Sequence, residues 1–254
     1  MRDLPQAFLD KMKGLLKEQY SDFIEIYREP PNQGLMVNTL KIDVKDFFTM
    51  VPFSLTPVPW AEGGFYYGYE DRPGKHPYYD AGLYYIQEPS AMAPARLLQV
   101  KPGHKVLDLC AAPGGKAFQL AADLKNKGFL IANEIDAARV RVLGENLERM
   151  GVKNVVITRE TPDRLAMVFD SYFDRILVDA PCSGEGMFRK NPEVRSMWSA
   201  TLPDRCSRRQ KDILKEAARM LAPGGKMVYS TCTISPEENE EVVDWFLKQH
   251  QDFY

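Results

Sequence analysis

The sequence predicts an α/β fold: a doubly wound, mostly parallel sheet preceded by a small α+β domain. From Lys105 onward, short β-rich runs alternate with helical patterns, which is typical of strands joined by crossover helices. Before residue 80 no such alternation is present. The 254 residues, 44% of them hydrophobic, are enough for one or two domains with a sizeable core. We therefore expect an N-terminal domain over residues 1–80 and a larger domain over 81–254.

The first part of the chain predicts a helix, a strand and a connector, in that order. Apolar residues at helical spacing predict an amphipathic helix within residues 4–28. The segment 34–44 predicts a strand from Leu35 to Ile42. Between Pro52 and Pro94 stand seven prolines and seven of the twelve tyrosines, with no simple period. We expect an ordered connecting segment there, with the domain boundary near Asp80.

The larger domain is predicted to contain five strands. They cover residues 106–109, 129–133, 155–158, 175–178 and 226–230. Helices are predicted over residues 116–124, 137–150 and 208–221. The last helix is predicted to open with a capping box at Ser235 and Glu238, with Pro236 at its first position, and to bury Val242, Val243 and Phe246. In such sheets ligands bind at the carboxyl ends of the strands, so chemistry is expected just beyond each of these strands.

The near-neutral charge conceals an uneven distribution. The chain has 33 Lys plus Arg against 35 Asp plus Glu. Between Gly186 and Lys211, however, seven basic residues face two acidic ones, and residues 235–254 carry six acids and one lysine. Near-neutrality therefore does not exclude a nucleic-acid partner, but binding would depend on a local basic patch.

The sequence predicts a cytoplasmic protein that has no membrane and no metal partner. No apolar run approaches the roughly 18 residues that a spanning helix needs, and the first residues show no apolar signal core. The four cysteines show neither the spacing of a metal knuckle nor that of a disulfide framework. We expect reduced thiols.

The turn after the first strand of the parallel sheet predicts a ligand loop. Residues 108–116 read Asp-Leu-Cys-Ala-Ala-Pro-Gly-Gly-Lys, and small residues between a strand and a helix let backbone N–H groups approach a ligand. The pattern matches neither a dinucleotide fingerprint nor a P-loop. After the next strand, Glu134 is placed to accept both hydroxyls of a ribose, whereas Asp136 is explained as a helix N-cap. Together the two strand ends favour an adenosine-bearing ligand.

Two thiols are predicted at neighbouring strand ends. Cys182 follows Asp179, and Cys232 lies between two threonines. A lone cysteine is usually a small buried hydrophobe, but a pair at this edge favours catalysis by a thiolate that attacks an electrophilic carbon. Cytosine supplies such a reaction, because a thiolate that adds at C6 makes C5 nucleophilic toward a methyl-sulfonium donor. Asp179 would hold the N3/N4 edge of a base unstacked into the site, and the other thiol would assist elimination.

These motifs resemble one known family. The segments 107–116, 179–184 and 230–233 look like the donor-binding and two catalytic motifs of the Sun-type RNA cytosine-C5 methyltransferases. The segments 82–91 and 184–190 are similar to the branch that methylates small-subunit ribosomal RNA, the methyltransferase F type. The resemblance extends over nearly the whole chain. It implies a Rossmann-like fold of the class I S-adenosylmethionine-dependent methyltransferases, with an N-terminal domain of an RNA-binding type.

The resemblance also assigns roles to residues. Cys232 would be the nucleophile, Cys182 would promote product release, and Asp179 would lie between donor and base. Glu134 would bind the ribose with support from Arg139. The S-adenosylmethionine loop would comprise Cys110, Ala111, Ala112, Pro113, Gly114, Gly115 and Lys116. At the third strand end, where the family usually has Asp near the adenine, this chain offers Glu160.

The implied substrate is small-subunit ribosomal RNA, free or assembled, with a monomeric intact enzyme. Relatives of this branch continue well past Tyr254, so we expect this chain to be truncated at its C-terminus. Three other functions are compatible with the sequence: methylation of an exocyclic amine, methylation of cytosine in tRNA or DNA, and RNA binding by a ribosome assembly factor without turnover. Only the cytosine chemistry needs thiols, and DNA methylation would not need Cys232.

Overall fold

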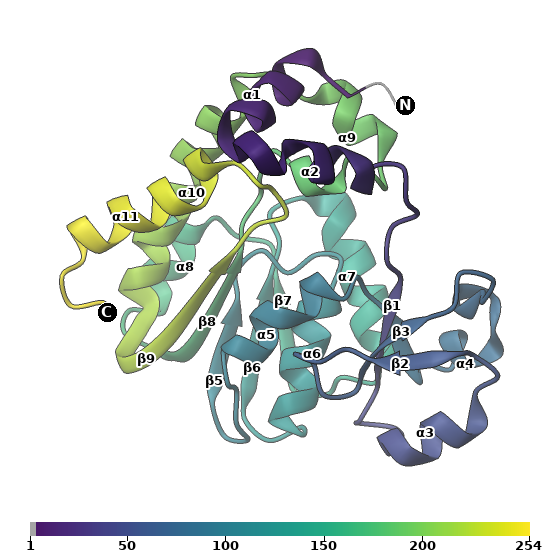
Figure 1. The fold of residues 1–254 in the computed structure, drawn as a ribbon. Coiled ribbons are helices and arrows are strands. Elements are labelled where there is room, and N and C mark those ends of the chain that lie inside the picture. The colour runs from purple at the N-terminus through teal and green to yellow at the C-terminus, as the bar shows by residue number, and fades with distance from the viewer. Residues whose placement is uncertain (1–3) are drawn as a thin grey trace. The chain divides into compact units, whose positions relative to one another are not determined.

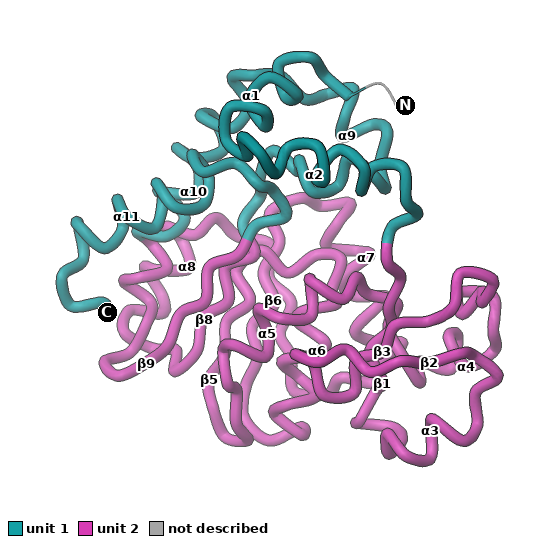
Figure 2. Tube along the Cα trace, in the orientation of Figure 1, with its two compact units in different colours: residues 1–31, 180–215, 231–254 teal, residues 32–179, 216–230 magenta. Residues whose placement is uncertain are grey.

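The structure is a computed structural model that describes residues 4–254. It contains two compact units (Figure 2). Unit 1 comprises residues 1–31, 180–215 and 231–254, and unit 2 comprises residues 32–179 and 216–230. Within the described part of the chain, no helix is long and apolar enough to cross a membrane.

Unit 2 contains the predicted parallel sheet (Figure 1). The strand order is β7-β6-β5-β8-β9, and every neighbouring pair is parallel. The strands are β5 (Lys105–Asp108), β6 (Phe129–Asn133), β7 (Val155–Thr158), β8 (Phe173–Asp179) and β9 (Leu221–Ser230). Because β5 lies at the centre, the chain reverses its winding there, which confirms the doubly wound fold and places a ligand crevice at the ends of the central strands.

Helices of unit 2 share one buried core with this sheet. They are α5 (Ala93–Leu97), α6 (Gly115–Leu124) and α7 (Ala137–Arg149); α8 (Pro162–Val168) follows β7 in the same unit. Phe118 of α6 and Leu143 of α7 are fully buried in the same hydrophobic cluster as Leu130 and Leu177 of the sheet. The apolar faces of α6 and α7 therefore pack against the strands.

A second, antiparallel sheet of unit 2 has the order β2-β3-β1-β4. Its strands are β1 (Gly34–Val37), β2 (Leu55–Pro57), β3 (Gly64–Tyr67) and β4 (Tyr84–Ile86), with α3 (Val44–Met50) and α4 (Pro77–Asp80) between them. The segment from Pro52 to Pro94 thus supplies three strands and is more than a connector. β4, which lies beyond the predicted boundary near Asp80, pairs with β1.

Strand β1 is shorter than predicted because Asn38 ends it. Its side-chain oxygen accepts a hydrogen bond from the backbone N–H of Leu40 (3.0 Å), which turns the chain. Its amide nitrogen donates to the carbonyls of Gly82 (2.7 Å) and Met150 (2.8 Å). A short polar side chain that captures the backbone in this way competes with the strand ladder, so the apolar pattern as far as Ile42 was misleading.

The carboxyl end of α7 is bound by Lys41, which lies just after strand β1 of the antiparallel sheet. Lys41 donates to the carbonyls of Ala81 (2.8 Å) and Arg149 (2.7 Å). Gly82 has a φ of +66°, and a Cβ built on it would lie 2.1 Å from the carbonyl oxygen of Arg149. Only glycine fits this approach of two backbones.

We therefore expect Gly82→Ala to lower the free energy of unfolding by about 2–4 kcal/mol, because it adds a steric clash to the strain of a positive φ. The measurement is the urea midpoint of the purified chain. Gly224→Ala is the matched control, since Gly224 has a φ of +75° and a Cβ added to it would meet nothing within 4 Å; it should cost only about 1 kcal/mol. Equal losses in the two variants would contradict the close approach at Gly82.

Unit 1 is helical in its described residues. Its helices are α1 (Gln6–Leu16), α2 (Tyr20–Ile26), α9 (Pro192–Met197), the first part of α10 (Leu202–Met220) and α11 (Glu240–Gln249). The single helix predicted within residues 4–28 is divided by a short 3-10 turn, Lys17–Gln19. The ring of Phe8 packs edge-on against Phe188 (4.9 Å between centroids) and Trp198 (6.0 Å).

The last helix begins differently from the prediction. Residues Pro236–Glu238 form a 3-10 turn, η5, and α11 starts after an irregular Asn239 (φ −111°, ψ −89°). The expected capping box is absent, because the side chains of Ser235 and Glu238 bond to other segments instead. Val242 and Phe246 are buried as predicted, but Val243 is 41% exposed.

Candidate functional site

The loop after β5 is held by side chains of α7. Arg139 donates to the carbonyl of Ala112 (2.7 Å), and Asn146 donates to the carbonyl of Pro113 (2.8 Å). Gly114, with a φ of +113°, then admits the chain into α6. Since the loop carbonyls are bound on the α7 side, the backbone N–H groups at the start of α6 are left at the edge of the sheet, where an anionic or polar ligand group would bind.

Glu134 lies buried at the end of β6 with a fixed orientation. Its side chain is 4% exposed, and one oxygen accepts from the backbone N–H of Asp136 (3.0 Å). The other oxygen lies 3.2 Å from Arg139. A carboxylate fixed in this way retains lone pairs for hydroxyl groups, as the ribose prediction requires. Asp136 caps α7 through Arg139 N, as expected.

Asp179, the last residue of β8, is held on both of its oxygens. Lys116 of α6 forms an ion pair with one oxygen (2.7 Å), and the hydroxyl of Ser230 donates to the other (2.7 Å). Ser230 is the last residue of the neighbouring strand β9. The sequence reasoning named Asp179 and Lys116 but not their contact, and it gave Ser230 no role.

Carboxylates at this edge repel one another. Asp108 is fully buried, and burial together with the nearby charge of Asp179 raises its pKa to about 8. Burial and the charges of Asp108 and Glu134 also raise the pKa of the Cys110 thiol, which keeps it protonated. Lys116 offsets only part of this repulsion. A positively charged ligand would relieve this repulsion. The carboxylates at this edge therefore fit the sulfonium and ammonium groups of S-adenosylmethionine.

Glu160 is tied to the same edge through Asn133, a residue that sequence reasoning left without a role. Asn133 is 2% exposed; its amide nitrogen donates to the carbonyls of Leu109 (3.2 Å) and Glu160 (3.0 Å). Its oxygen accepts from Thr158 Oγ1 (2.8 Å). The Glu160 side chain pairs with Arg164 (3.2 Å). Asn133 is a polar residue in an otherwise apolar strand, and this feature of the sequence could have identified it as a functional candidate.

In unit 1, the two cysteines predicted to be catalytic are in contact. The sulfur atoms of Cys182 and Cys232 lie 3.2 Å apart, and the backbone N–H of Cys232 points to the sulfur of Cys182 (3.3 Å). The hydrogen bond with Cys232 and burial raise the pKa of the Cys182 thiol. Cys182 is half-buried and Cys232 is exposed. The pair is therefore a protonated thiol beside an accessible sulfur.

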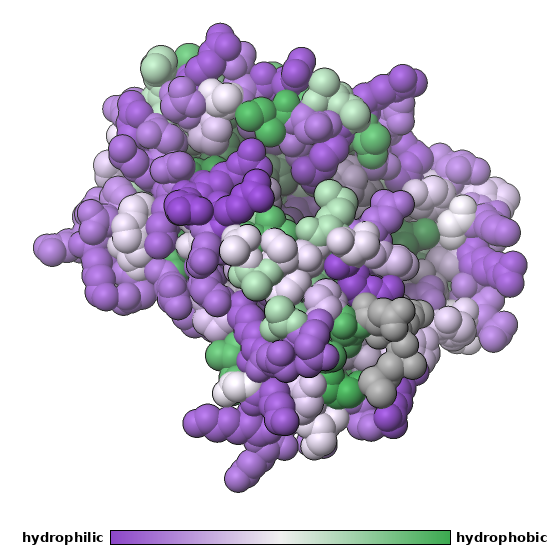
Figure 3. All heavy atoms as spheres, turned by 90° about the horizontal axis from the view of Figure 1, so that it is seen from above, coloured by the Kyte–Doolittle hydropathy of each residue, from purple (hydrophilic) through white to green (hydrophobic). Residues whose placement is uncertain are grey.

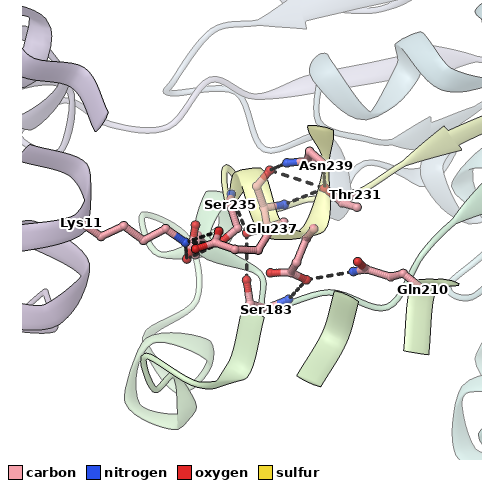
Figure 4. Close-up of polar contacts among 10 residues, drawn as sticks. Lys11, Ser183, Gln210, Thr231, Ser235, Glu237 and Asn239 are labelled. Atoms are coloured by element: carbon pink, nitrogen blue, oxygen red, sulfur yellow. Dashed lines mark hydrogen bonds and ion pairs between the residues drawn. The ribbon is translucent and has the colours of Figure 1, made fainter. Parts of the chain in front are cut away.

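The segments that carry these cysteines are braced by buried polar groups (Figure 4). We call residues 180–185 the first cysteine loop and residues 231–235 the second cysteine loop. The hydroxyls of Ser183 and Thr233 share a hydrogen bond (2.8 Å). Glu238, which is fully buried, accepts from Ser183 N (2.9 Å) and from the side chain of Gln210 (2.9 Å). Sequence reasoning had given Glu238 only a capping role.

The fold and these strand-end residues define a Rossmann-like methyltransferase. The chain belongs to the family described as 16S rRNA methyltransferase RsmB/F, whose sequence model matches residues 95–254. A second model, the N-terminal domain of 16S rRNA methyltransferase RsmF, matches residues 4–89. The predicted family is thereby confirmed, while the division at residue 80 stays a prediction.

Relatives agree with this assignment. Ribosomal RNA small subunit methyltransferase F of Serratia proteamaculans is 41% identical over 98% of this chain and 54% of its own length. The protein of that name from Escherichia coli is 38% identical with the same coverage. The chain thus spans about half the length of the curated relatives it matches.

Solved structures show the same fold. A methyltransferase homolog protein from Pyrococcus horikoshii superposes with a TM-score of 0.84 at 35% identity, over 96% of this chain and 78% of that one. NSun6 from Pyrococcus horikoshii, solved with SFG, gives a TM-score of 0.86 at 23% identity, over 98% of this chain and 88% of that one.

Proposed function

We propose that this chain carries out S-adenosylmethionine-dependent methylation of C5 of cytosine in small-subunit ribosomal RNA. The observation that carries the proposal is the 3.2 Å contact between the sulfurs of Cys182 and Cys232, in a chain that belongs to a 16S rRNA methyltransferase family. Methyl transfer to an oxygen or to an exocyclic nitrogen needs no thiol, whereas C5 of cytosine must first be activated by a nucleophile at C6.

Unit 2 would supply the donor site. S-adenosylmethionine carries a methyl group on a positively charged sulfur. The loop from Cys110 to Lys116 would hold it, with Glu134 on the ribose hydroxyls, Arg139 supporting Glu134, and Glu160 near the adenine. Two observations support these proposed roles. The Glu134 carboxylate is buried and held in one orientation, and the carboxylates around Cys110 repel one another, which favours a positively charged ligand.

Cys232 would add to C6 as the thiolate. The sulfur–C6 bond forms while the electron pair of the C5–C6 double bond moves to C5. C5 then forms a bond to the methyl group, and the sulfur–methyl bond of the donor breaks, so that the donor leaves as a neutral thioether. Asp179, fixed by Lys116 and Ser230, would accept a hydrogen bond from the cytosine amino group and orient the ring. The sequence supports assigning these residues to one reaction, because Cys182 comes three residues after Asp179 and Cys232 two residues after Ser230.

Cys182 would act in the second half of the reaction. Its pKa is raised first by the hydrogen bond with Cys232, then by burial and by the charge of Cys232. Once Cys232 has become a thioether it no longer carries a charge, so this cause of the raised pKa of Cys182 is removed, while burial remains. Cys182 would then give its thiol proton to solvent and, as the thiolate, take up the C5 proton; the C5–C6 double bond re-forms as the sulfur–C6 bond breaks, and the electron pair of that bond returns to the Cys232 sulfur. The contact would therefore favour the protonated Cys182 thiol before addition, and its loss would make deprotonation of Cys182 easier afterwards.

RNA would bind along the basic segment between Arg189 and Lys211. Arg205, Arg208 and Arg209 of this segment are exposed. In the space-filling view hydrophilic residues predominate, with hydrophobic residues in small separate groups (Figure 3). A polar surface with local positive charge suits a phosphate backbone better than an apolar partner.

The test is tritium release from RNA that carries tritium at C5 of cytosine. With S-adenosylmethionine, each methylation should release one tritium to water, and small-subunit ribosomal RNA or the assembled subunit should be a better substrate than tRNA or single-stranded DNA. Methyl incorporation without tritium release would place the methyl group elsewhere and contradict the proposal. RNA binding without methyl transfer would favour an assembly factor.

A further inference from the structure

The ammonium group of Lys11 meets both cysteine loops within unit 1 (Figure 4). Lys11 projects from α1 and donates to the hydroxyl of Ser235 (2.6 Å) and to Glu237 (2.8 Å). It lies 3.6 Å from a carboxylate oxygen of Glu185. Glu185 belongs to the first cysteine loop and Ser235 to the second, so one side chain touches segments that are 50 residues apart in the sequence.

The two contacts are placed alike relative to the thiols. Glu185 comes three residues after Cys182, and Ser235 comes three residues after Cys232. Ser235 donates to Glu185 (2.8 Å), which closes a triangle with Lys11. The backbone N–H of Gly186, the residue that follows the first cysteine loop, donates to the carbonyl of Cys232 (3.0 Å) in the second.

The carboxylate of Glu185 needs this ammonium group. Its side chain is fully buried, and its second oxygen has no hydrogen bond within residues 4–254. A buried carboxylate without a cation is costly, because neither water nor another charge compensates for its lost hydration. Lys11, only 19% exposed, places a cation 3.6 Å from it.

We propose that Lys11 is a positioning residue that holds the two cysteine loops together, so that helix α1 sets the contact between the sulfurs of Cys182 and Cys232. This inference rests on the proposed function and extends the machinery of the thiol pair to a residue more than 170 positions away in the sequence. Lys11 touches neither thiol; it acts through Glu185 and Ser235.

The first test measures the thiol contact without catalysis. Phenylarsine oxide reacts with two neighbouring thiols: two arsenic–sulfur bonds form, and the oxygen leaves as water with both thiol protons. The unsubstituted chain should bridge Cys182 and Cys232, as identified by peptide mass spectrometry. Lys11→Met should slow bridging about tenfold, since displacements of about 1 Å strongly affect such geometry. Lys13 is an exposed lysine of the same helix, so the control variant Lys13→Met should bridge arsenic as fast as the unsubstituted chain.

The second test separates positioning from binding. In Lys11→Met, kcat for methyl transfer should fall about 10- to 100-fold, while KM for S-adenosylmethionine stays unchanged, because the donor residues are held by contacts within unit 2. Lys11→Arg keeps the charge and should restore most of kcat. A rise in KM with an unchanged kcat would overturn the proposal.

A double variant separates positioning from stability. Lys11→Met leaves the Glu185 charge buried and is expected to lower the urea midpoint; adding Glu185→Gln removes that charge and should restore the midpoint. Arsenic bridging and kcat should nevertheless stay low, because the contact of the α1 ammonium group with both loops is still missing. Recovery of both in the double variant would show that Lys11 only neutralises Glu185, and would overturn the proposal.

The two proposals fail in different ways. If the unsubstituted chain bridges arsenic but releases no tritium, the proposed function fails while the effect of Lys11 on bridging can still be seen. If Lys11→Met bridges arsenic and turns over like the unsubstituted chain, the role of Lys11 is refuted and the proposed function stands. Absence of bridging in the unsubstituted chain would contradict the thiol contact itself.

Discussion

Replacing Cys232 by serine is expected to lower methyl transfer by at least about 10³-fold, because a serine hydroxyl is a far weaker nucleophile than a thiolate at neutral pH. The measurement is transfer of a labelled methyl group to small-subunit ribosomal RNA. Serine is nearly the size of cysteine, so the unfolding midpoint should change little. The exposed position of Cys232 also makes a packing defect a poor explanation for lost activity.

Cys206→Ser is the matched control for this experiment. Cys206 lies on α10, where burial and the charge of Glu238 raise its thiol pKa to about 11, so it stays protonated. A serine there keeps a hydrogen-bond donor, and activity should stay within about twofold. Full turnover in Cys232→Ser would refute Cys232 as the nucleophile and would redirect attention to Cys182, the thiol in the Pro-Cys context.

Replacing Cys182 by alanine should have the opposite signature: RNA remains attached to the protein. Without the base that removes the C5 proton, the sulfur–C6 bond cannot break after methyl transfer. Multiple turnover should fall about 10²- to 10³-fold, while one equivalent of RNA accumulates as a complex that survives denaturing electrophoresis.

The double variant Cys182→Ala, Cys232→Ser tests the origin of that complex. It should show no attached RNA, because the sulfur that forms the bond is missing. If the complex persisted in the double variant, some other nucleophile would be responsible. Free turnover in Cys182→Ala would mean that water or another group removes the proton.

The parallel sheet was predictable because its signal is local. Strands β6 and β7 have the predicted bounds, 129–133 and 155–158, since each is a short apolar run between clear helix and turn signals. Neighbouring strand ends then brought Cys182 and Cys232 together as expected, and the structure shows their contact. The roles assigned to the two cysteines remain predictions until the variants are measured.

Features that depend on distant partners were not predictable. Asn38, which ends β1, also donates to the carbonyls of Gly82 and Met150, which are far away in the sequence. The local sequence predicts that Glu238 is a capping residue, but its carboxylate accepts hydrogen bonds from Ser183 and Gln210 instead. In both cases a buried polar contact overrides the local structural preference. Leaving such a polar group unpaired costs more free energy than a further strand residue or a helix cap contributes.

The contacts at the two ends of α7 have a consequence for any shortened version of the protein. Near its start and near its end, α7 holds the loop after β5 through Arg139 and Asn146. At its last turn it is anchored by Asn38 and Lys41. A chain that began after the antiparallel sheet would retain every residue of the donor loop but would lose the anchor of the helix that shapes it. The antiparallel sheet is in this sense a foundation of the proposed donor site, and cutting it away should loosen the loop between β5 and α6 even though every residue of that loop remains.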